Sequence, residues 1–262
     1  MTKFDLYSES AINEMIRRLK DVDEIRIHTT SVGGCMGREA FRWSGAPKLA
    51  PMHFWSAKGT VAHHIIEKNI IDGEPLRYDP DEITKVAVGR GTYVPQRLAH
   101  AIRPQVETAL KNFKIWLEQT EIDLDPENLI GAEVRLESPL RGRYTLTGAI
   151  DLLTEKVIID FKNGKKSYQK AYYKQLGNYE RLCIEHELGT EFQKTLVFLG
   201  DPDGPQEYTP KAASIKSAMQ FFKKELDDRM RAYDLMEQGV LPCFNPGFGC
   251  SLCPYRGICA GV

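Results

Sequence analysis

The chain has 262 residues, of which 42% are hydrophobic and 27% are charged. This balance is typical of a globular protein and excludes disordered, collagen-like and coiled-coil classes. Lysine and arginine number 35 against 36 aspartates and glutamates, and the net charge of -1 excludes an overall basic nucleic-acid footprint. With no long apolar run and no secretory signal, we expect no membrane association and a cytoplasmic protein with reduced cysteines.

Hydrophobic periodicity predicts a helical first part and a mixed second part. Helices are expected over residues 10–20, 57–71 and 95–119, and Pro104 is a point where the last of them kinks or divides. The elements expected next are strands over 129–137, 144–153 and 156–161, a helix over 168–187, a strand over 192–199 and a helix over 214–238. Gly189 and Gly239 are expected to end the two later helices.

The stretches between these elements carry turn residues. Residues 29–42 are broken by glycines, and residues 72–90 resemble a surface excursion. Residues 201–205 form a turn cluster, and the last 20 or so residues are too rich in proline, glycine and cysteine for a regular element. The three tryptophans could stack on nucleic-acid bases, although core packing is the expected role for most of them.

Two aspartates and one lysine are the first candidates for chemistry. Asp151 and Asp160 lie near the ends of consecutive predicted strands, so antiparallel pairing would bring their carboxylates together. Such carboxylates repel unless a cation separates them, and oxygen ligands favour Mg²⁺ or Mn²⁺ over Zn²⁺. Lys162 shares a strand face with Asp160, which suits metal-assisted hydrolysis. The simpler alternative is a salt bridge at a strand end.

Three further features accompany this trio. His63 follows a glycine on a predicted helix, and imidazole is a good metal ligand. Gln175 and Tyr179 share a helix face and could orient a phosphate or a base. A local basic stretch could attract phosphate: Lys162, Lys165, Lys166, Lys170 and Lys174. Each feature taken alone is also an ordinary structural one.

The order of these motifs carries a resemblance to a known family. The motifs are Gly59-x-x-x-His63, Gly148-x-x-Asp151, Asp160-Phe161-Lys162 and Gln175-x-x-x-Tyr179. In this order they resemble the RecB-like branch of the PD-(D/E)XK nucleases, as does the predicted run of helix, three strands, helix and strand. The resemblance covers about residues 63–199 together with both chain ends.

The resemblance implies a role for each matched residue. It makes Lys162 the catalytic lysine and gives Gln175 and Tyr179 a part in DNA handling and site geometry. The divalent-metal ligands that it implies are His63, Asp151, Asp160 and the backbone carbonyl of Phe161. Glu133 corresponds to an acidic position of some relatives. Ile150 stands where the superfamily motif has proline, a departure that this branch commonly shows.

The resemblance also implies the fold and its organisation. We expect an α/β fold with a restriction-endonuclease-like core, in which helices flank a central mixed sheet. Residues 1–262 would form a single nuclease domain. Within it, residues 1–94 would be a helical region contributing Cys35 and His63, residues 95–200 the nuclease core, and residues 201–262 a helix followed by a cysteine-rich segment.

The cysteines suggest a second metal centre. Cys250, Cys253 and Cys259 form a C-x2-C-x5-C array that needs a fourth ligand, for which Cys35 and Cys243 are candidates. Spacing alone leaves a structural Zn²⁺ site open. The chain is similar to iron–sulfur members of the RecB-like branch, namely the CRISPR-associated RecB-like nuclease and AddB-type helicase–nucleases. That similarity implies a [4Fe–4S] cluster on Cys35, Cys250, Cys253 and Cys259.

The function implied is a Mg²⁺- or Mn²⁺-dependent deoxyribonuclease. The resemblance favours an exonuclease acting on single-stranded DNA ends, with endonuclease activity also open. No Walker motif is present, so a helicase or CRISPR or recombination proteins would be separate partners. The alternatives are a non-catalytic module that binds nucleic acid or protein on the same fold, and a nuclease stabilised by Zn²⁺.

Overall fold

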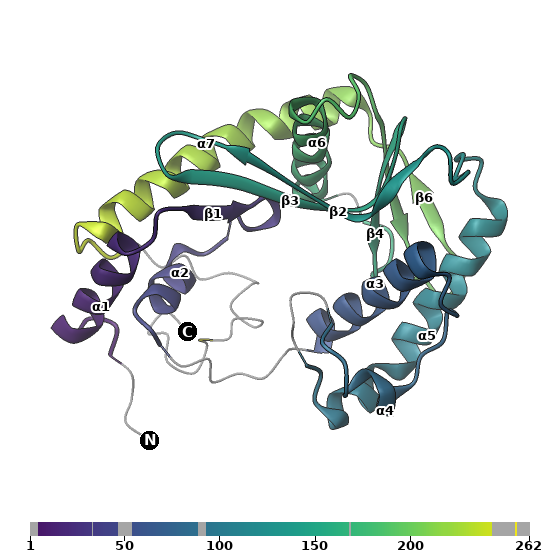
Figure 1. Ribbon diagram of the computed structural model, residues 1–262, viewed down its shortest axis with the longest axis horizontal. Helices are drawn as coiled ribbons and strands as arrows, with labels where there is room; N and C mark the ends of the chain where they lie inside the picture. Colours follow the sequence, from purple (N-terminus) through teal and green to yellow (C-terminus); the bar gives the residue numbers. More distant parts are fainter. Residues whose placement is uncertain are drawn as a thin grey trace. The chain divides into compact units, whose positions relative to one another are not determined.

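The computed structural model describes residues 5–32, 34–46, 54–88, 93–167, 169–242 and 255. Figure 1 shows the helices and strands, whose bounds are α1 (Glu9–Lys20), β1 (Ile25–His28), the 3-10 turn η1 (Thr29–Ser31), α2 (Met36–Trp43), α3 (Phe54–Asp72), α4 (Pro80–Ile83), α5 (Gln96–Gln119), β2 (Leu129–Pro139), β3 (Tyr144–Thr154), β4 (Val157–Lys162), α6 (Lys170–Glu185), β5 (Gln193–Phe198), β6 (Gln206–Tyr208) and α7 (Ala212–Glu237). Within these ranges, no helix has both the length and the apolar character needed to cross a bilayer.

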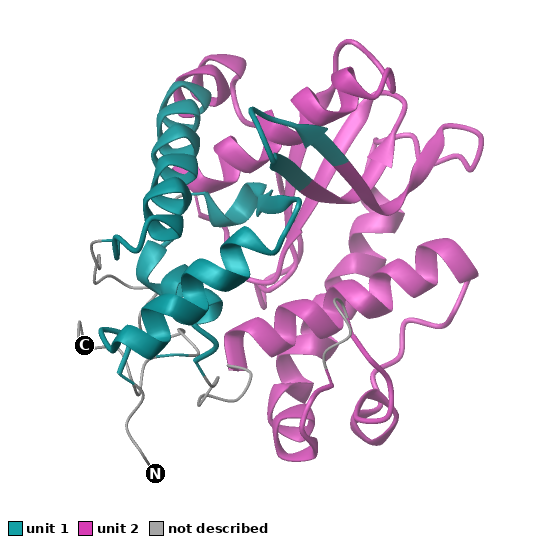
Figure 2. Ribbon diagram, turned by 60° about the vertical axis from the view of Figure 1, so that its left-hand side comes forward, with its two compact units in different colours: residues 1–53, 137–147, 219–262 teal, residues 54–136, 148–218 magenta. Residues whose placement is uncertain are grey.

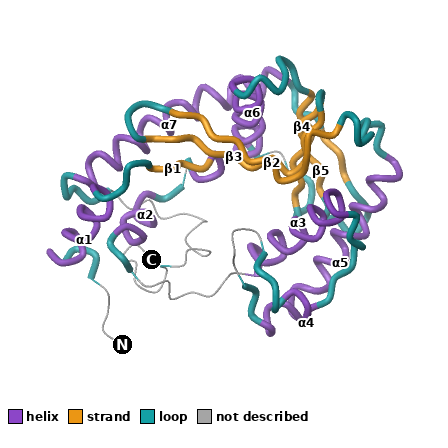
Figure 3. The backbone as a smooth tube through the Cα atoms, in the orientation of Figure 1, coloured by secondary structure: helices purple, strands orange, loops and turns teal. Residues whose placement is uncertain are grey.

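In the described part of the chain the strands form one six-stranded mixed sheet. Its order is β1-β3-β4-β5-β6, and β2 pairs with β3. β3 and β4 run antiparallel, whereas β4 and β5 run parallel, as do β1 and β3. Figure 3 shows the strands in orange with helices around them. The predicted α/β class with a mixed central sheet and flanking helices is confirmed.

The chain divides into two compact units, coloured separately in Figure 2. Residues 1–53, 137–147 and 219–262 belong to unit 1, and residues 54–136 and 148–218 belong to unit 2. The elements β2, β3 and α7 each continue from one unit into the other. These units do not test the single-domain assignment, which stays a prediction.

Unit 2 is built on aromatic and aliphatic packing between its helices and β4. Helix α5 continues through Pro104 as one element, so the predicted division does not occur. Its Phe113 and Trp116 rings both make T-shaped contacts with the ring of Phe161, at centroid distances of 5.4 Å. The three rings are buried. This packing fixes β4 against α5 and so anchors the strand that carries Asp160 and Lys162.

Helix α6 ends differently from the prediction. Glu187, rather than Gly189, takes the left-handed conformation after the helix, with a φ of 58°. The Glu187 and Leu188 amides donate to the carbonyls of Ile184 and Cys183, the paired bonds of a Schellman motif. Leu188 packs against the core, and this apolar contact explains why the helix stops earlier than glycine placement suggested.

Two other stretches contain elements that the sequence left unassigned. Residues 29–43 contain α2 and follow the four-residue strand β1, which is too short for a periodic signal. Residues 72–90 were expected to be a surface excursion, yet Tyr78, Ile83 and Val88 are buried. The Tyr78 hydroxyl donates to the Ala99 carbonyl at 2.7 Å and ties the segment to α5.

Candidate active site

The antiparallel pairing of β3 and β4 sets the position of the two aspartates. Leu152 pairs with Ile159 and Leu153 with Ile158, so continuation of the same register places Asp151 across from Asp160. The backbone N–H of Phe161 donates to Asp151 Oδ2 at 2.6 Å. The two carboxylates therefore lie on neighbouring strands, in the arrangement that the sequence predicts.

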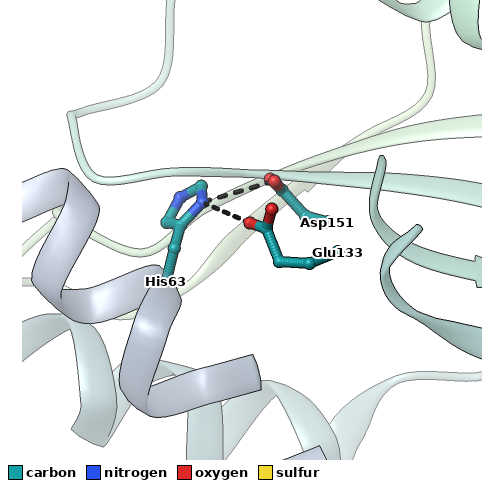
Figure 4. A group of neighbouring side chains, drawn as sticks. All are labelled: His63, Glu133 and Asp151. Carbon is teal, nitrogen blue, oxygen red and sulfur yellow. Dashed lines mark ion pairs between the residues drawn. The ribbon is translucent and has the colours of Figure 1, made fainter. Parts of the chain in front are cut away.

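His63, Glu133 and Asp151 form a compact group contributed by α3, β2 and β3. His63 Nδ1 lies 3.3 Å from Asp151 Oδ1 and 3.9 Å from Glu133 Oε1. Figure 4 shows the three side chains pointing toward one another. Glu133 has a φ of 49° within its strand, a left-handed conformation that is uncommon for a residue other than glycine and that recurs at functional sites.

This group fits a divalent cation. One ligand atom from each of the three residues lies within 4.8 Å of the other two. An octahedral ion with ligands at about 2.1 Å sets neighbouring ligand atoms about 3 Å apart and opposite ones about 4 Å apart. The distances of 3.3 and 3.9 Å from His63 Nδ1 lie in this range. The two carboxylates are ligands that Mg²⁺ and Mn²⁺ prefer, whereas the imidazole is also a common ligand of Zn²⁺ and Fe²⁺.

A second chain of contacts joins the other candidates. Asp160 is 1% exposed, and its Oδ2 lies 2.5 Å from Lys162 Nζ. The Gln175 amide links both charges, since its Nε2 donates to Asp160 Oδ1 at 2.9 Å and its Oε1 accepts from Lys162 Nζ at 3.0 Å. Gln175 Nε2 also contacts the hydroxyl of Tyr179 at 2.6 Å. The predicted shared face of α6 is confirmed, and it holds the ammonium and the carboxylate in place.

Burial and charge move the pKa values in this region. Burial raises the pKa of Asp160 to about 6, partly offset by the ammonium of Lys162. Burial lowers the pKa of Lys162, but the nearby carboxylates of Asp160 and Asp151 outweigh it and give a net increase. Burial likewise opposes the charged form of His63, yet Asp151 and Glu133 raise its pKa to about 10. The carboxylates of Asp151 and Glu133 thus favour a positive charge at His63, and a divalent cation bound between these three residues would replace the imidazole proton.

Asp160 Oδ2 takes no part in these hydrogen bonds. It is buried, and within the described residues it has no hydrogen-bond partner despite its closeness to the Lys162 ammonium. The neighbour of this oxygen is the Lys162 ammonium at 2.5 Å, and the clustered ligand atoms come from His63, Glu133 and Asp151 without Asp160. The role of Asp160 as a metal ligand stays a prediction.

Two residues near the site escaped sequence reasoning. The Lys162 ammonium lies 4.7 Å from the ring centroid of Tyr172, a cation–π contact. Tyr172 precedes Gln175 by one helical turn, so the spacing of Tyr172, Gln175 and Tyr179 could have revealed it. Asn163 follows Lys162, and its Nδ2 donates to the Gly59 carbonyl at 3.3 Å. This bond joins the end of β4 to α3.

The cysteine predictions fall mostly outside the described residues. The residues outside the described ranges include Cys243, Cys250, Cys253 and Cys259. Cys35 is half-buried at the position that precedes α2. Cys183 is fully buried among the apolar residues around α6, as the sequence predicts for a small core residue.

Comparison with known proteins identifies the class that this fold and site define. Residues 41–260 match the family model of the PD-(D/E)XK nuclease superfamily. The match covers most of the chain, and the chain therefore belongs to this superfamily of nucleases. A search of the curated proteins finds no match.

Among solved structures, the chain is similar to the crystal structure of a proposed exonuclease from Eubacterium rectale. The two share 10% sequence identity over 100% of this chain and 99% of the other, with a TM-score of 0.50. At that identity the likeness shows the fold alone, and it agrees with a restriction-endonuclease-like core.

Proposed function

We propose that this protein is a Mg²⁺- or Mn²⁺-dependent deoxyribonuclease of the RecB-like branch that acts as an exonuclease on single-stranded DNA ends. One observation carries the proposal: the His63, Glu133 and Asp151 group lies beside the contact network of Asp160 and Lys162. Membership of a nuclease superfamily supports the reaction type. The branch and the single-stranded substrate are supported by the motif order.

The residues divide the work of phosphodiester hydrolysis between them. His63, Glu133 and Asp151, with Asp160 nearby, would hold a divalent cation, which when bound would supply Lewis-acid polarisation of a phosphoryl oxygen and a lowered pKa of water. Lys162 places a positive charge where the attacked phosphate gains negative charge. Gln175 fixes the direction of this ammonium.

A cleavage assay tests the proposal directly. Single-stranded and duplex DNA, labelled at either end, are incubated with Mg²⁺ or Mn²⁺ and with the wild type, Asp160→Ala or Lys162→Ala. We expect each variant to lose at least ~100-fold in rate, in line with the loss of a preorganised charge. Lys156→Ala, an exposed lysine at the other end of β4, is the matched control and keeps the wild-type rate. Equal cleavage by all four proteins would contradict the proposed site.

We also propose that Cys35, Cys250, Cys253 and Cys259 hold a [4Fe–4S] cluster. A contact within unit 1 supports this set. Tyr255 lies in sequence between Cys253 and Cys259, and its buried ring stacks on Phe41 of α2 with centroids 5.4 Å apart. Cys35 stands directly before that helix. The stacking therefore brings one residue of the cysteine-rich segment to the helix that Cys35 precedes.

Metal analysis separates this proposal from its main alternative. Protein purified without oxygen should contain about four iron atoms per chain, and the cluster should absorb light at about 400 nm. Zinc at one atom per chain, without iron, would instead support a structural Zn²⁺ site on the same cysteines.

A further inference from the structure

Tyr172 of α6 lies beside the ammonium of Lys162 in unit 2. The Lys162 Nζ atom is 4.7 Å from the centroid of the Tyr172 ring, a cation–π contact. One helical turn later, Gln175 Oε1 accepts a hydrogen bond from the same ammonium at 3.0 Å. The ammonium therefore has two neighbours from one helix, an aromatic face and an amide oxygen.

The Tyr172 ring is held in this place from the sheet. Phe198, the last residue of β5, is fully buried and is the register partner of Lys162 on the neighbouring parallel strand. Its ring meets that of Tyr172 with centroids 6.2 Å apart and an angle of 60° between the ring planes. Tyr172 thus contacts both members of one strand pair, and this packing opposes a rotation of its ring away from Lys162.

The hydroxyl of Tyr172 takes no part in this packing. Among the residues that the structure describes, no group forms a hydrogen bond with it, and its oxygen is not one of the buried atoms that lack a partner. The two other tyrosines of α6 in the described ranges differ, since the hydroxyl of Tyr173 lies 3.4 Å from that of Tyr208 and the hydroxyl of Tyr179 contacts Gln175. The Tyr172 donor is therefore available to a ligand.

The hydroxyl lies within reach of an anion bound at Lys162. Because a tyrosine oxygen is about 2.8 Å from its ring centroid, and the centroid is 4.7 Å from Nζ, the two donors are at most about 7.5 Å apart. Phosphate oxygens are about 2.5 Å apart, and a hydrogen bond of about 2.8 Å at each end lets one phosphate join donors up to roughly 8 Å apart. The Lys162 side chain is 16% exposed, so its ammonium is accessible to such a ligand.

We propose that Tyr172 contacts the substrate: its hydroxyl donates to a non-bridging oxygen of the DNA phosphate that is bound and attacked beside Lys162. This inference rests on the proposed nuclease activity and adds a residue that touches the reacting group. A phenol is a neutral donor, and its bond to the phosphate strengthens as negative charge builds up during the attack. The ring has a separate task, because it supports the ammonium.

Cleavage by Tyr172→Phe separates the hydroxyl from the ring. Phenylalanine keeps the aromatic face beside the ammonium and the contact with Phe198, and it loses only the oxygen. We expect kcat/KM on labelled single-stranded DNA to fall about 10- to 100-fold, as for the loss of one hydrogen bond to a charged group. Tyr173→Phe is the matched control on the same helix, because its hydroxyl lies near that of Tyr208, and it should cleave at the wild-type rate.

Binding measurements show whether the hydroxyl acts directly or only through Lys162. In a Lys162→Ala background, the affinity for a short labelled single-stranded oligonucleotide is measured with and without Tyr172→Phe. A direct contact with the bound phosphate should give a further loss of about 3- to 10-fold although the ammonium is gone. Tyr173→Phe in the same background should bind like its parent.

The outcomes distinguish this inference from the proposed function. If the wild type cleaves DNA and Tyr172→Phe keeps the wild-type kcat/KM, the role of the hydroxyl is wrong and the nuclease assignment stands. Slower cleavage without a further loss of binding in the Lys162→Ala background would make Tyr172 a positioning residue for Lys162 and overturn the phosphate contact. If the wild type cleaves no DNA with Mg²⁺ or Mn²⁺, the proposed function fails and this role fails with it.

Discussion

Gly148 lies directly against the ring of Tyr179. A Cβ atom at Gly148 would stand 3.1 Å from Tyr179 Cε1 and 2.8 Å from Leu182 Cδ1. Both distances are below ordinary carbon contact, so β3 and α6 approach to a distance that only glycine permits at this position. Because Tyr179 contacts Gln175, and Gln175 links Asp160 to Lys162, this approach sets the position of the two charges that are proposed to act in catalysis.

Gly148→Ala should therefore harm both stability and catalysis. Overpacking at a buried contact costs about 1–3 kcal/mol, and displacement of α6 would move Gln175 away from Lys162. We expect unfolding at lower urea concentration and a fall in kcat that is larger than the change in KM. Gly164→Ala is the control, since a Cβ there meets nothing within 4 Å. A Gly148→Ala protein with wild-type kcat would show that the close approach is irrelevant to the chemistry.

The sequence predicts much of this arrangement because its signals are local. Asp151, Asp160 and Lys162 stand on two consecutive strands joined by a tight turn, so strand periodicity alone places them near one another. Gln175 and Tyr179 are four residues apart on one helix, a spacing that predicts a shared face. The contacts between these two sets follow once α6 packs on β4.

The parts that the sequence could not predict depend on contacts between distant segments. Glu133 corresponds to an acidic position that only some relatives have, so the motifs single it out weakly. It lies near His63 because β2 pairs with β3, while α3 contributes the imidazole from a distant part of the chain. The aromatic contact of Tyr172 depends on the direction of the Lys162 side chain. Short elements such as β1 carry too few residues to show a period.

Glu133→Gln should weaken divalent-metal binding. Glu133 supplies one of the three clustered ligand atoms, and an amide oxygen carries no net charge to attract the cation. Binding to the folded state alone stabilises a protein by RT ln(1 + [L]/Kd). Adding Mn²⁺ to chelator-treated wild type should raise Tm by several degrees, and the rise should shrink in Glu133→Gln.

The control for this titration is Glu155→Gln, which changes an exposed carboxylate at the turn between β3 and β4. It should show the wild-type rise in Tm. The same rise in Glu133→Gln would remove Glu133 from the ligand set and leave His63 with Asp151.

Arg229→Met should destabilise unit 1. Arg229 is 2% exposed, its Nη2 lies 3.1 Å from Glu39 Oε1, and its Nη1 donates to the carbonyls of Ser31 and Val32. Removing the arginine takes the closest cation from the buried Glu39 and leaves it with the more exposed Arg42 at 3.4 Å and Arg38 at 3.6 Å. The cost should therefore fall below the about 3–5 kcal/mol of a fully unpaired buried charge. Arg26→Met, which removes exposed pairs with Glu24 and Glu137, should cost no more than about 1 kcal/mol.

A double variant separates the ion pair from simple loss of packing. Arg229→Met combined with Glu39→Leu leaves no unpaired charge, so it should recover part of the stability lost by Arg229→Met alone. Urea unfolding is measured for the wild type, Arg229→Met, Glu39→Leu and the double variant. Additive losses in the double variant would mean that the two charges do not stabilise one another.

Cys250→Ala should abolish the proposed iron–sulfur cluster without changing the residues of the candidate active site. A cluster held by Cys35 and three cysteines of the last segment ties the two ends of the chain together, and such a link removes loop entropy from the unfolded state. We expect loss of absorbance near roughly 400 nm, loss of iron and lower solubility or Tm. Cys183→Ala, a buried cysteine of α6 outside the proposed ligand set, should keep its colour and its iron. Brown protein with stoichiometric iron after Cys250→Ala would reject the assignment, because a four-cysteine cluster cannot lose one ligand and remain the same site.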